Sequence, residues 1–150
     1  MQTPSGDGFE YLSGSSLTAG MTQEQVRVLA GCGTPENYPD GETLVKQGAN
    51  EFDLLVLVEG KCEIRTTMDD ILYRLGPHSL IGEMSFLDHK PRSAKAIAIG
   101  DCRAIRFPST LLEDLEATRP DIVAKLLKNI GVVLVQKLRS TTRFAEASFV

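Results

Sequence analysis

One acidic and one basic residue mark the ends of a short stretch whose composition suits the binding of a small anion. Glu83 and Arg92 lie nine positions apart, with Gly82 at the start of the stretch and Pro91 near its end. The segment between them is too short for two regular elements, so we expect a short helix over residues 83–87 followed by a tight loop. A guanidinium offers two parallel donors to a phosphate, and an ionised carboxylate accepts from a sugar hydroxyl.

The groups around these two charges fit the same kind of ligand. Gly82 allows the backbone to approach a ligand closely, and a helix that starts there presents unpaired N–H groups. Ser93 adds a hydroxyl beside Arg92. A ligand with one phosphate and one sugar hydroxyl would satisfy both charges at once. A second interpretation stays open at this point: Glu83 and Arg92 form an exposed ion pair on a surface loop, worth about 0–1 kcal/mol and without function.

The stretch also resembles a known family. Its residues from Gly82 to Ala94, G-E-M-S-F-L-x-x-x-P-R-S-A, are similar to the phosphate-binding cassette of the cyclic nucleotide-binding domain family in residue type and in spacing. That family includes bacterial regulators of the catabolite-activator and Fnr types and the regulatory subunits of cAMP-dependent kinases. The resemblance extends over roughly residues 17–143, including Pro39-Asp40-Gly41-Glu42, Gly48 and Val58-Glu59-Gly60.

This resemblance implies a role for each cassette residue. Glu83 would bind the ribose 2′-hydroxyl and Arg92 the cyclic phosphate, and the Ser93 hydroxyl and nearby backbone amides would complete the cradle. The implied ligand site comprises Gly82, Glu83, Met84, Ser85, Arg92, Ser93 and Ala94. Phe144 and Phe149, near the end of the chain, are the candidates to cover the base.

Three places depart from the family pattern. His78-Ser79 stands where family members usually have Gly-Asp, His89 where several have Gly, and Lys95 where Thr or Ser is common. These changes leave the implied ribose and phosphate contacts intact. They leave open which base is preferred and how tightly it is held.

Composition limits the other possibilities. With 150 residues, a formal charge of −4 and 42% hydrophobic residues, the chain fits one globular domain and does not fit broad electrostatic capture of nucleic acid or of an acidic membrane. Cys32, Cys62 and Cys102 lack the spacing of a disulfide framework or a metal site, so we expect small core residues in a reducing compartment. No signal peptide or spanning apolar run is visible, which favours a cytoplasmic location.

The histidines argue against a metalloenzyme. The family resemblance implies a jelly-roll barrel, a fold that also occurs in metal-dependent enzymes. Such enzymes need several histidines and an acid around one metal ion. This chain has only His78 and His89, both in predicted loops. We therefore expect no metal, no cofactor and no catalysis.

Turn signals every eight to twelve residues between residues 36 and 107 predict a β-sandwich or barrel. Leu54 to Val58 is apolar on both faces and belongs in the middle of the packing, and Glu59-Gly60 predicts a tight hairpin. The resemblance implies an eight-stranded jelly roll, a mainly β fold with flanking helices, with the cassette between its sixth and seventh strands. The predicted strands are residues 43–46, 54–58, 62–65, 71–75, 94–99 and 103–107.

Helix signals flank the β region. Residues 1–20, rich in Gly, Ser and Thr, predict a flexible lead-in. Thr22 is expected to cap a short helix that ends near Gly31, with Gln25 completing a capping box. Residues 21–119 would then form the jelly roll with its flanking helices.

The C-terminal region is predicted to be helical. Ser109 is the expected N-cap of a helix over residues 110–117, and Pro120 suits the first turn of a long helix within residues 120–150. The long helix has a broad apolar stripe, made of Ile122, Val123, Leu126, Leu127, Ile130, Val133, Leu134 and Leu138. Packing on the β domain would account for much of it. The resemblance to the dimerisation helix of the bacterial regulators favours homodimerisation for the rest, against simple packing or a missing neighbouring domain.

The leading hypothesis is a regulatory sensor module that binds a cyclic mononucleotide, cAMP more than cGMP, without chemistry. Occupancy would be transmitted through the C-terminal helix to a dimer or to an effector. Because no helix-turn-helix segment follows that helix, DNA binding within this chain is not expected. The alternative is a ligand-blind jelly-roll module that keeps the fold for dimerisation or docking alone.

Overall fold

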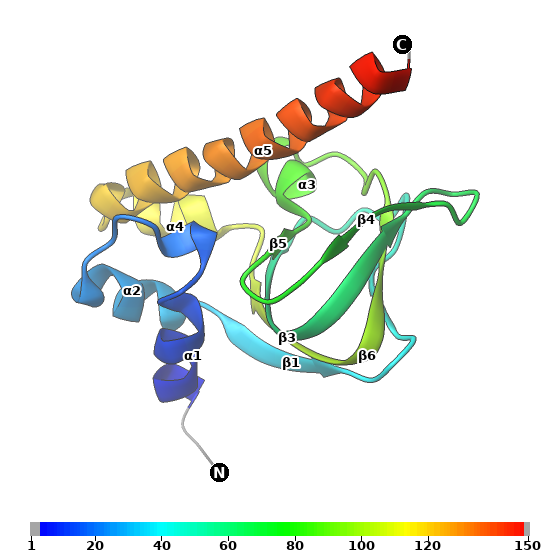
Figure 1. Ribbon diagram of the computed structural model, residues 1–150. Coiled ribbons are helices and arrows are strands. Elements are labelled where there is room, and N and C mark those ends of the chain that lie inside the picture. Colours follow the sequence, from blue (N-terminus) through cyan, green and yellow to red (C-terminus); the bar gives the residue numbers. More distant parts are fainter. Residues whose placement is uncertain (1–3, 149–150) are drawn as a thin grey trace.

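Two long antiparallel strands, β3 (Leu54–Arg65) and β6 (Lys95–Phe107), form the ribbon to which the rest of the chain is attached (Figure 1). The computed structural model describes residues 4–148, and side chains over residues 8–140. The ribbon bends midway, where its register shifts on both sides of Glu59. Gly60 lies at the bend with φ of 94°, a conformation that side chains disfavour.

The bend divides the sheet into two layers. The first half of β3 and the second half of β6 pair with β1 (Thr34–Tyr38) and β5 (Leu80–Ile81). The other halves pair with β2 (Thr43–Val45) and β4 (Ile71–Leu75). Each half of the ribbon is therefore flanked by one short strand on each side, which is the arrangement of an open jelly roll.

Apolar side chains from both layers meet between them. The alternating residues of β3 and β6 point into this space, and small residues on β6 leave room in it. This interior core consists of Tyr38, Leu44, Val45, Leu55, Leu57, Cys62, Ile64, Ile81, Ala96, Ala98, Cys102 and Ala104. Cys62 and Cys102 are thus core residues, as the sequence predicted, and Cys32 is half-buried.

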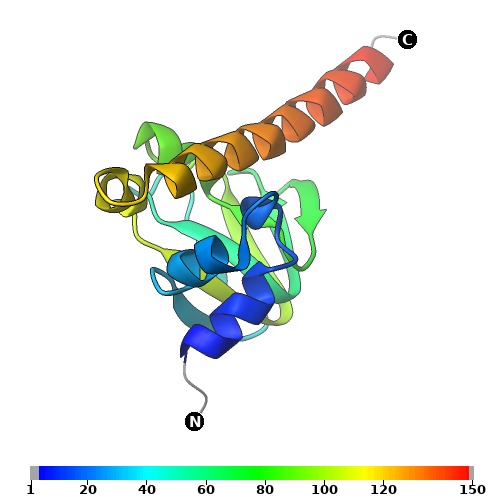
Figure 2. The same cartoon turned by 90° about the vertical axis from the view of Figure 1, so that its left-hand side faces the viewer.

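The helices cover the outer face of the first layer (Figure 2). They are α1 (Pro4–Leu12), the 3₁₀ helix η1 (Ser16–Thr18), α2 (Gln23–Ala30), α4 (Leu111–Glu116) and α5 (Pro120–Ser148). The opposite side chains of the same two strands, among them Leu54, Val56 and Phe107, pack with these helices into a second core. Leu54 to Val58 is buried on both faces for this reason, as predicted.

Helix α5 is the longest element in the described part of the chain. At 1.5 Å per residue its 29 residues span about 44 Å, and its C-terminal part projects beyond the β layers (Figure 1). Its first half is fixed by buried apolar residues and by Asn129, whose side chain donates to the carbonyls of Leu17 (2.7 Å) and Ala19 (2.9 Å). Of the helices in the described residues, none is both long and apolar enough to cross a bilayer.

Several predicted elements are confirmed and others are wrong. The Thr22–Gln25 capping box is present, with both of its hydrogen bonds, and Pro120 begins α5. Thr110, not Ser109, precedes α4, and it makes no side-chain capping bond. The predicted hairpin at residues 59–60 is wrong, because β3 continues through it and both halves pair with β6.

The strand count also has a simple explanation. β1 and β5 were not predicted, because β1 contains Pro35, Glu36 and Asn37 and β5 has two residues only. If the halves of β3 and β6 are counted separately, the segments number eight, and the cassette falls between the sixth and the seventh. The jelly-roll prediction is confirmed in this sense.

The predicted flexible lead-in is replaced by structure within the described residues. α1 and η1 occupy most of residues 4–18, and Leu12 and Leu17 are fully buried against the helical core. Ser15 caps η1, and Thr18 donates to a carbonyl of α1. The apolar residues in this segment are few but well placed, which is why composition alone suggested a linker.

Candidate ligand-binding site

The cassette forms one short helix between two strands. Gly82 follows β5 with φ of 82° and directly precedes α3 (Glu83–Asp88). His89 ends the helix in a left-handed conformation, and its N–H donates to the Ser85 carbonyl at 2.8 Å. A side chain on Gly82 would press on the guanidinium of Arg92, whose Cζ lies 3.0 Å from the place of a Cβ. Glycine is thus required here by its conformation and by this contact.

Arg92 is buried, with only 4% of its surface exposed. Its guanidinium donates to the carbonyls of Gly82 (2.9 Å) and Asp53 (2.6 Å), and its Nε has no hydrogen-bond partner within the described residues. Its own backbone is held by Gly48 and Ala49. Burial lowers the pKa of Arg92 from its ordinary value, although a guanidinium stays protonated at neutral pH.

No carboxylate within the described side chains forms an ion pair with Arg92. The hydrogen bonds of this buried cation go to neutral carbonyls, and carboxylates such as Glu51 and Asp53 act on it only through space, so an anion placed beside it would be favoured. Asp53 positions the guanidinium of Arg92 through its backbone carbonyl. Its own carboxylate accepts from the backbone N–H of Ser109 at 2.9 Å, which fixes the place of that carbonyl.

Glu83 is equally buried, at 4% exposure, and it pairs with Lys137 of α5. The ammonium group of Lys137 also lies over the ring of Tyr73, 5.5 Å from its centroid. Burial raises the pKa of the Tyr73 hydroxyl above its ordinary value. Glu83 and Arg92 therefore do not pair with each other on a surface loop, and that interpretation is wrong.

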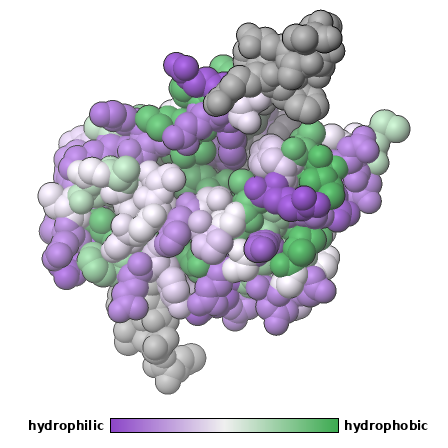
Figure 3. All heavy atoms as spheres, in the orientation of Figure 1, coloured by the Kyte–Doolittle hydropathy of each residue, from purple (hydrophilic) through white to green (hydrophobic). Residues whose placement is uncertain are grey.

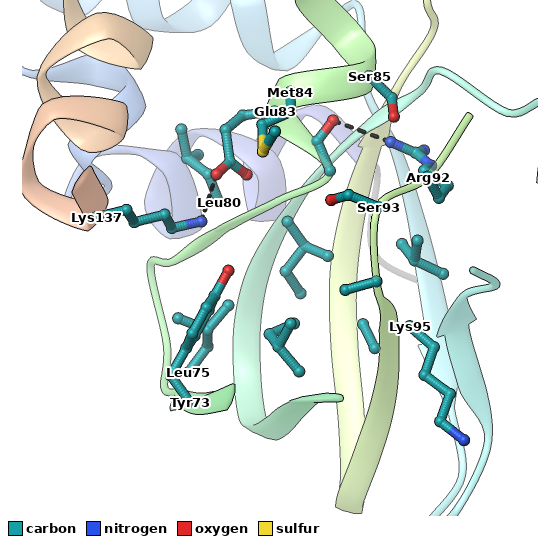
Figure 4. A pocket seen from close by; sticks show the side chains of 16 residues that line it. Tyr73, Leu75, Leu80, Glu83, Met84, Ser85, Arg92, Ser93, Lys95 and Lys137 are labelled. Carbon is teal, nitrogen blue, oxygen red and sulfur yellow. Dashed lines mark hydrogen bonds and ion pairs between the residues drawn. The ribbon is translucent and has the colours of Figure 1, made fainter. Parts of the chain in front are cut away.

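All seven residues of the predicted site line one cavity (Figure 4). Glu83 and Arg92 stand on either side of it, with Ser93 between them and Lys137 reaching in from α5. The cavity itself measures about 50 Å³. A neighbouring groove of about 840 Å³ lies between β4 and α5 and shares Tyr73, Leu75, Leu80 and Lys137 with the cavity. Lys137 and Tyr73 thus form part of the wall between the two hollows.

The structure shows the surroundings of the three residues that depart from the family pattern, His78, His89 and Lys95. His78 and His89 both adopt positive φ, of 74° and 54°, a conformation in which glycine has the least steric strain. The ring of His89 stacks on Phe52. Lys95 points away from Glu83 and Arg92 (Figure 4) and pairs with Asp69 at 2.7 Å.

Sequence reasoning missed Tyr73, Asp53 and the role of Lys137. Each reaches the site from a segment outside the cassette, and no local motif surrounds any of them. The two candidates for covering the base cannot be placed, because the side chain of Phe144 and the whole of Phe149 lie outside the described residues.

The fold is an open jelly roll, and its inserted helix brings a buried carboxylate and a buried guanidinium to one cavity. This arrangement is typical of a ligand-binding domain. The profile of the cyclic nucleotide-binding domain family matches residues 35–119, more than half of the chain. The chain therefore belongs to the cyclic nucleotide-binding domain family. This confirms the family suggested by the cassette, and with it a binding and regulatory domain in place of an enzyme.

Individual relatives agree with this assignment. A CRP-like cAMP-activated global transcriptional regulator from Mycobacterium tuberculosis is 29% identical over 136 residues, covering 88% of this chain and 59% of the relative. A cyclic AMP receptor protein from Thermus thermophilus is 31% identical over 134 residues, covering 85% and 59%. The chain thus spans about three fifths of the length of these relatives.

A solved structure shows the same fold. The crystal structure of a cyclic nucleotide-binding domain from Methylobacillus flagellatus superposes with a TM-score of 0.84 at 22% identity, covering 96% of this chain and 83% of that one. At this identity the similarity supports the architecture alone.

Proposed function

We propose that this domain binds a cyclic mononucleotide, cAMP in preference to cGMP, in the cavity between α3, the start of β6 and α5. The observation that carries the proposal is the pair of buried, oppositely charged groups that face one cavity without pairing with each other. A buried guanidinium held only by carbonyls favours an anion, and a buried carboxylate favours a hydroxyl donor. A cyclic nucleotide has both groups on one rigid ring system.

The proposed contacts follow from this arrangement. Arg92 donates to the cyclic phosphate, Glu83 accepts from the ribose 2′-hydroxyl, and the Ser93 hydroxyl with the backbone amides of Met84, Ser85 and Ala94 completes the phosphate cradle. The preference for cAMP is supported by the names of the two relatives above, which are described as cAMP-activated and as a cyclic AMP receptor.

Binding also requires a movement near α5. Pockets for small organic ligands usually measure about 300–1,000 Å³, well above the 50 Å³ of this cavity. Moving the Tyr73 ring, which is part of the wall between the two hollows, would join the cavity to the neighbouring groove and provide that volume. Since Lys137 of α5 pairs with Glu83, a ligand hydroxyl that binds Glu83 would release this helix. A signal arises if the ligand has different affinities for the two positions of α5.

The output of that shift is proposed to be a homodimer formed through α5. Large apolar side chains remain exposed along this helix, among them Leu127, Val132, Val135 and Leu138. Figure 3 shows further apolar surface on the side of the molecule that carries β4, where Ile71 and Leu72 are exposed. Large apolar side chains exposed on one helix commonly mark an interface.

A ligand-blind interaction module is the second candidate, and one observation favours it. The ion pair with Lys137 already satisfies Glu83 without any ligand. Arg92 weighs against it, because its buried charge has no such partner within the described side chains. Thermal shift with a panel of cyclic mono- and dinucleotides separates the two, since a response to none of them would favour the blind module.

The direct test is calorimetric titration of cAMP and cGMP into the purified chain and into Arg92→Ala. Removing a buried charged partner should weaken binding by about 2–5 kcal/mol, which is roughly thirtyfold to several thousandfold in Kd. Arg139→Ala, an exposed arginine on α5, is the control and should bind like the wild type. Equal affinities for the wild type and Arg92→Ala would refute the assigned role of Arg92.

A further inference from the structure

Lys137 is the one lysine among the described side chains that forms an ion pair with a cassette residue. It reaches Glu83 from α5, far away in sequence, and its ammonium lies between that carboxylate and the Tyr73 ring (Figure 4). The proposed ribose contact and this ion pair therefore use the same acceptor.

The burial of Glu83 makes sharing of this acceptor unfavourable. Its carboxylate side chain is only 5% exposed, so it can be approached almost solely from the cavity, where Lys137 already is. A buried carboxylate loses much if it is left without a donor, so each state of the site needs either the ammonium or a ligand hydroxyl there. Because both donors must approach the carboxylate from the cavity, they compete for the same space.

We propose that Lys137 sets the affinity and the sugar specificity of the pocket by competing with the ligand's 2′-hydroxyl for Glu83. This inference rests on the proposed function. A ribonucleotide must displace the ammonium before its hydroxyl reaches the carboxylate, so the ion pair weakens its binding. A 2′-deoxy ligand has no hydroxyl to donate to Glu83, so the ion pair between Glu83 and Lys137 is kept. The wild type therefore discriminates less between the two sugars than a variant without the ammonium.

The competition also explains how an event at the ribose reaches α5. Lys137 ties the helix to the cassette in the free protein, and the ligand hydroxyl releases this tie. The release is specific to one hydrogen bond and does not require α3 to move. Lys137 is thus a specificity-determining residue that acts through Glu83, and direct contact with the ligand is not part of its role.

The experiment compares cAMP and 2′-deoxy-cAMP on the wild type and on Lys137→Met, which keeps an apolar side chain of similar length and removes the charge. Lys137→Met should bind cAMP at least about fivefold more tightly, the lower end of typical coupling between two sites. Its affinity for 2′-deoxy-cAMP should stay within about twofold of the wild type. Lys128→Met, an exposed lysine on the same helix, is the control and should change neither.

A double-mutant cycle checks that the effect passes through the carboxylate. In a Glu83→Gln background the Lys137 substitution should no longer tighten cAMP binding, because the shared acceptor has lost its charge. If Lys137→Met is too unstable to purify, Lys137→Gln keeps a donor for Glu83 without the charge, and it should also tighten cAMP binding.

Three results would overturn the inference while leaving the proposed function in place. They are weaker cAMP binding by Lys137→Met, unchanged binding, and equal tightening for both sugars, which would indicate a steric gate. If neither the wild type nor Lys137→Met binds any cyclic nucleotide, both the inference and the proposed function are wrong. Tightening that depends on the 2′-hydroxyl supports both.

Discussion

Gly82 and Arg92 fit together because one of them has no side chain. Gly82 has φ of 82°, and its carbonyl accepts from the guanidinium that lies against its Cα. Gly41 has nearly the same φ, 84°, but nothing lies within 4 Å of the place of its Cβ. The two glycines therefore separate the effect of backbone strain from the effect of the contact.

We expect Gly82→Ala to weaken cAMP binding at least about tenfold and Gly41→Ala to leave it unchanged. Both substitutions should lower the free energy of unfolding by about 1–2 kcal/mol, because alanine is strained in this conformation. Only at Gly82 does the new methyl group also displace Arg92. Calorimetry and denaturant unfolding of the two variants measure these effects, and an equal loss of affinity in both would remove the steric argument.

At the scale of residues, the sequence predicted those parts of the site that lie within one short stretch. Gly82, Glu83, Arg92 and Ser93 were predicted because their spacing sets up a helix start and a loop that can face one ligand. Lys137 lies far outside that stretch, on the C-terminal helix. Its contact with Glu83 depends on how α5 packs, and no local pattern encodes that.

At the scale of elements, the junction of α2 with the start of α5 is held by charges. Arg119 forms ion pairs with Glu24 of α2 (2.5 Å) and with Asp121 of α5 (2.9 Å), and Gln25 donates to Asp121 at 2.8 Å. The hydrogen bond from Arg119, followed by that from Gln25, holds the pKa of Asp121 well below its usual range. The ionised carboxylate is therefore stabilised in the folded state.

This depressed pKa predicts an acid-sensitive junction. Because the folded pKa of Asp121 lies below the unfolded value of about 3.9, its contribution to stability is complete above that pH and is lost as the pH falls toward the folded pKa. Asp121→Asn should therefore lower the Tm at pH 7, and its difference from the wild type should shrink at pH 3. Thermal unfolding followed by circular dichroism tests this, with the exposed Asp70→Asn as control. A constant difference at both pH values would contradict the prediction.

The elements also show where sequence patterns mislead. Glu59-Gly60 has the composition of a hairpin turn, yet the strand continues there because both halves of β3 find partners on β6. Positive φ at Gly60 serves a bend between two layers, which local sequence cannot distinguish from a reversal of the chain. By contrast, the Thr22 capping box is satisfied within four residues, and it was predictable for that reason.

At the scale of the whole molecule, the exposed face of α5 determines the proposed assembly. Val132 and Val135 are 47% and 48% exposed on the helix. We expect the double variant Val132→Glu/Val135→Glu to raise the dimer Kd at least about a hundredfold, because charges buried without partners cost several kcal/mol. Size-exclusion chromatography with light scattering measures this. Lys128→Glu is the charge control, and a wild type that stays monomeric at high concentration would exclude the dimer.

The β3–β6 ladder also determines when the pocket can exist during folding. It pairs Arg65 with Lys95 and Leu54 with Phe107, and the whole cassette lies in the loop that these pairs close. Chain entropy must be lost before such distant residues gain contacts, which is typical of folding on the millisecond-to-second scale. Arg92 meets the Asp53 carbonyl only after this closure. A nucleotide consequently has nothing to bind in a half-folded chain, so its stabilisation appears as slower unfolding and leaves the folding rate unchanged.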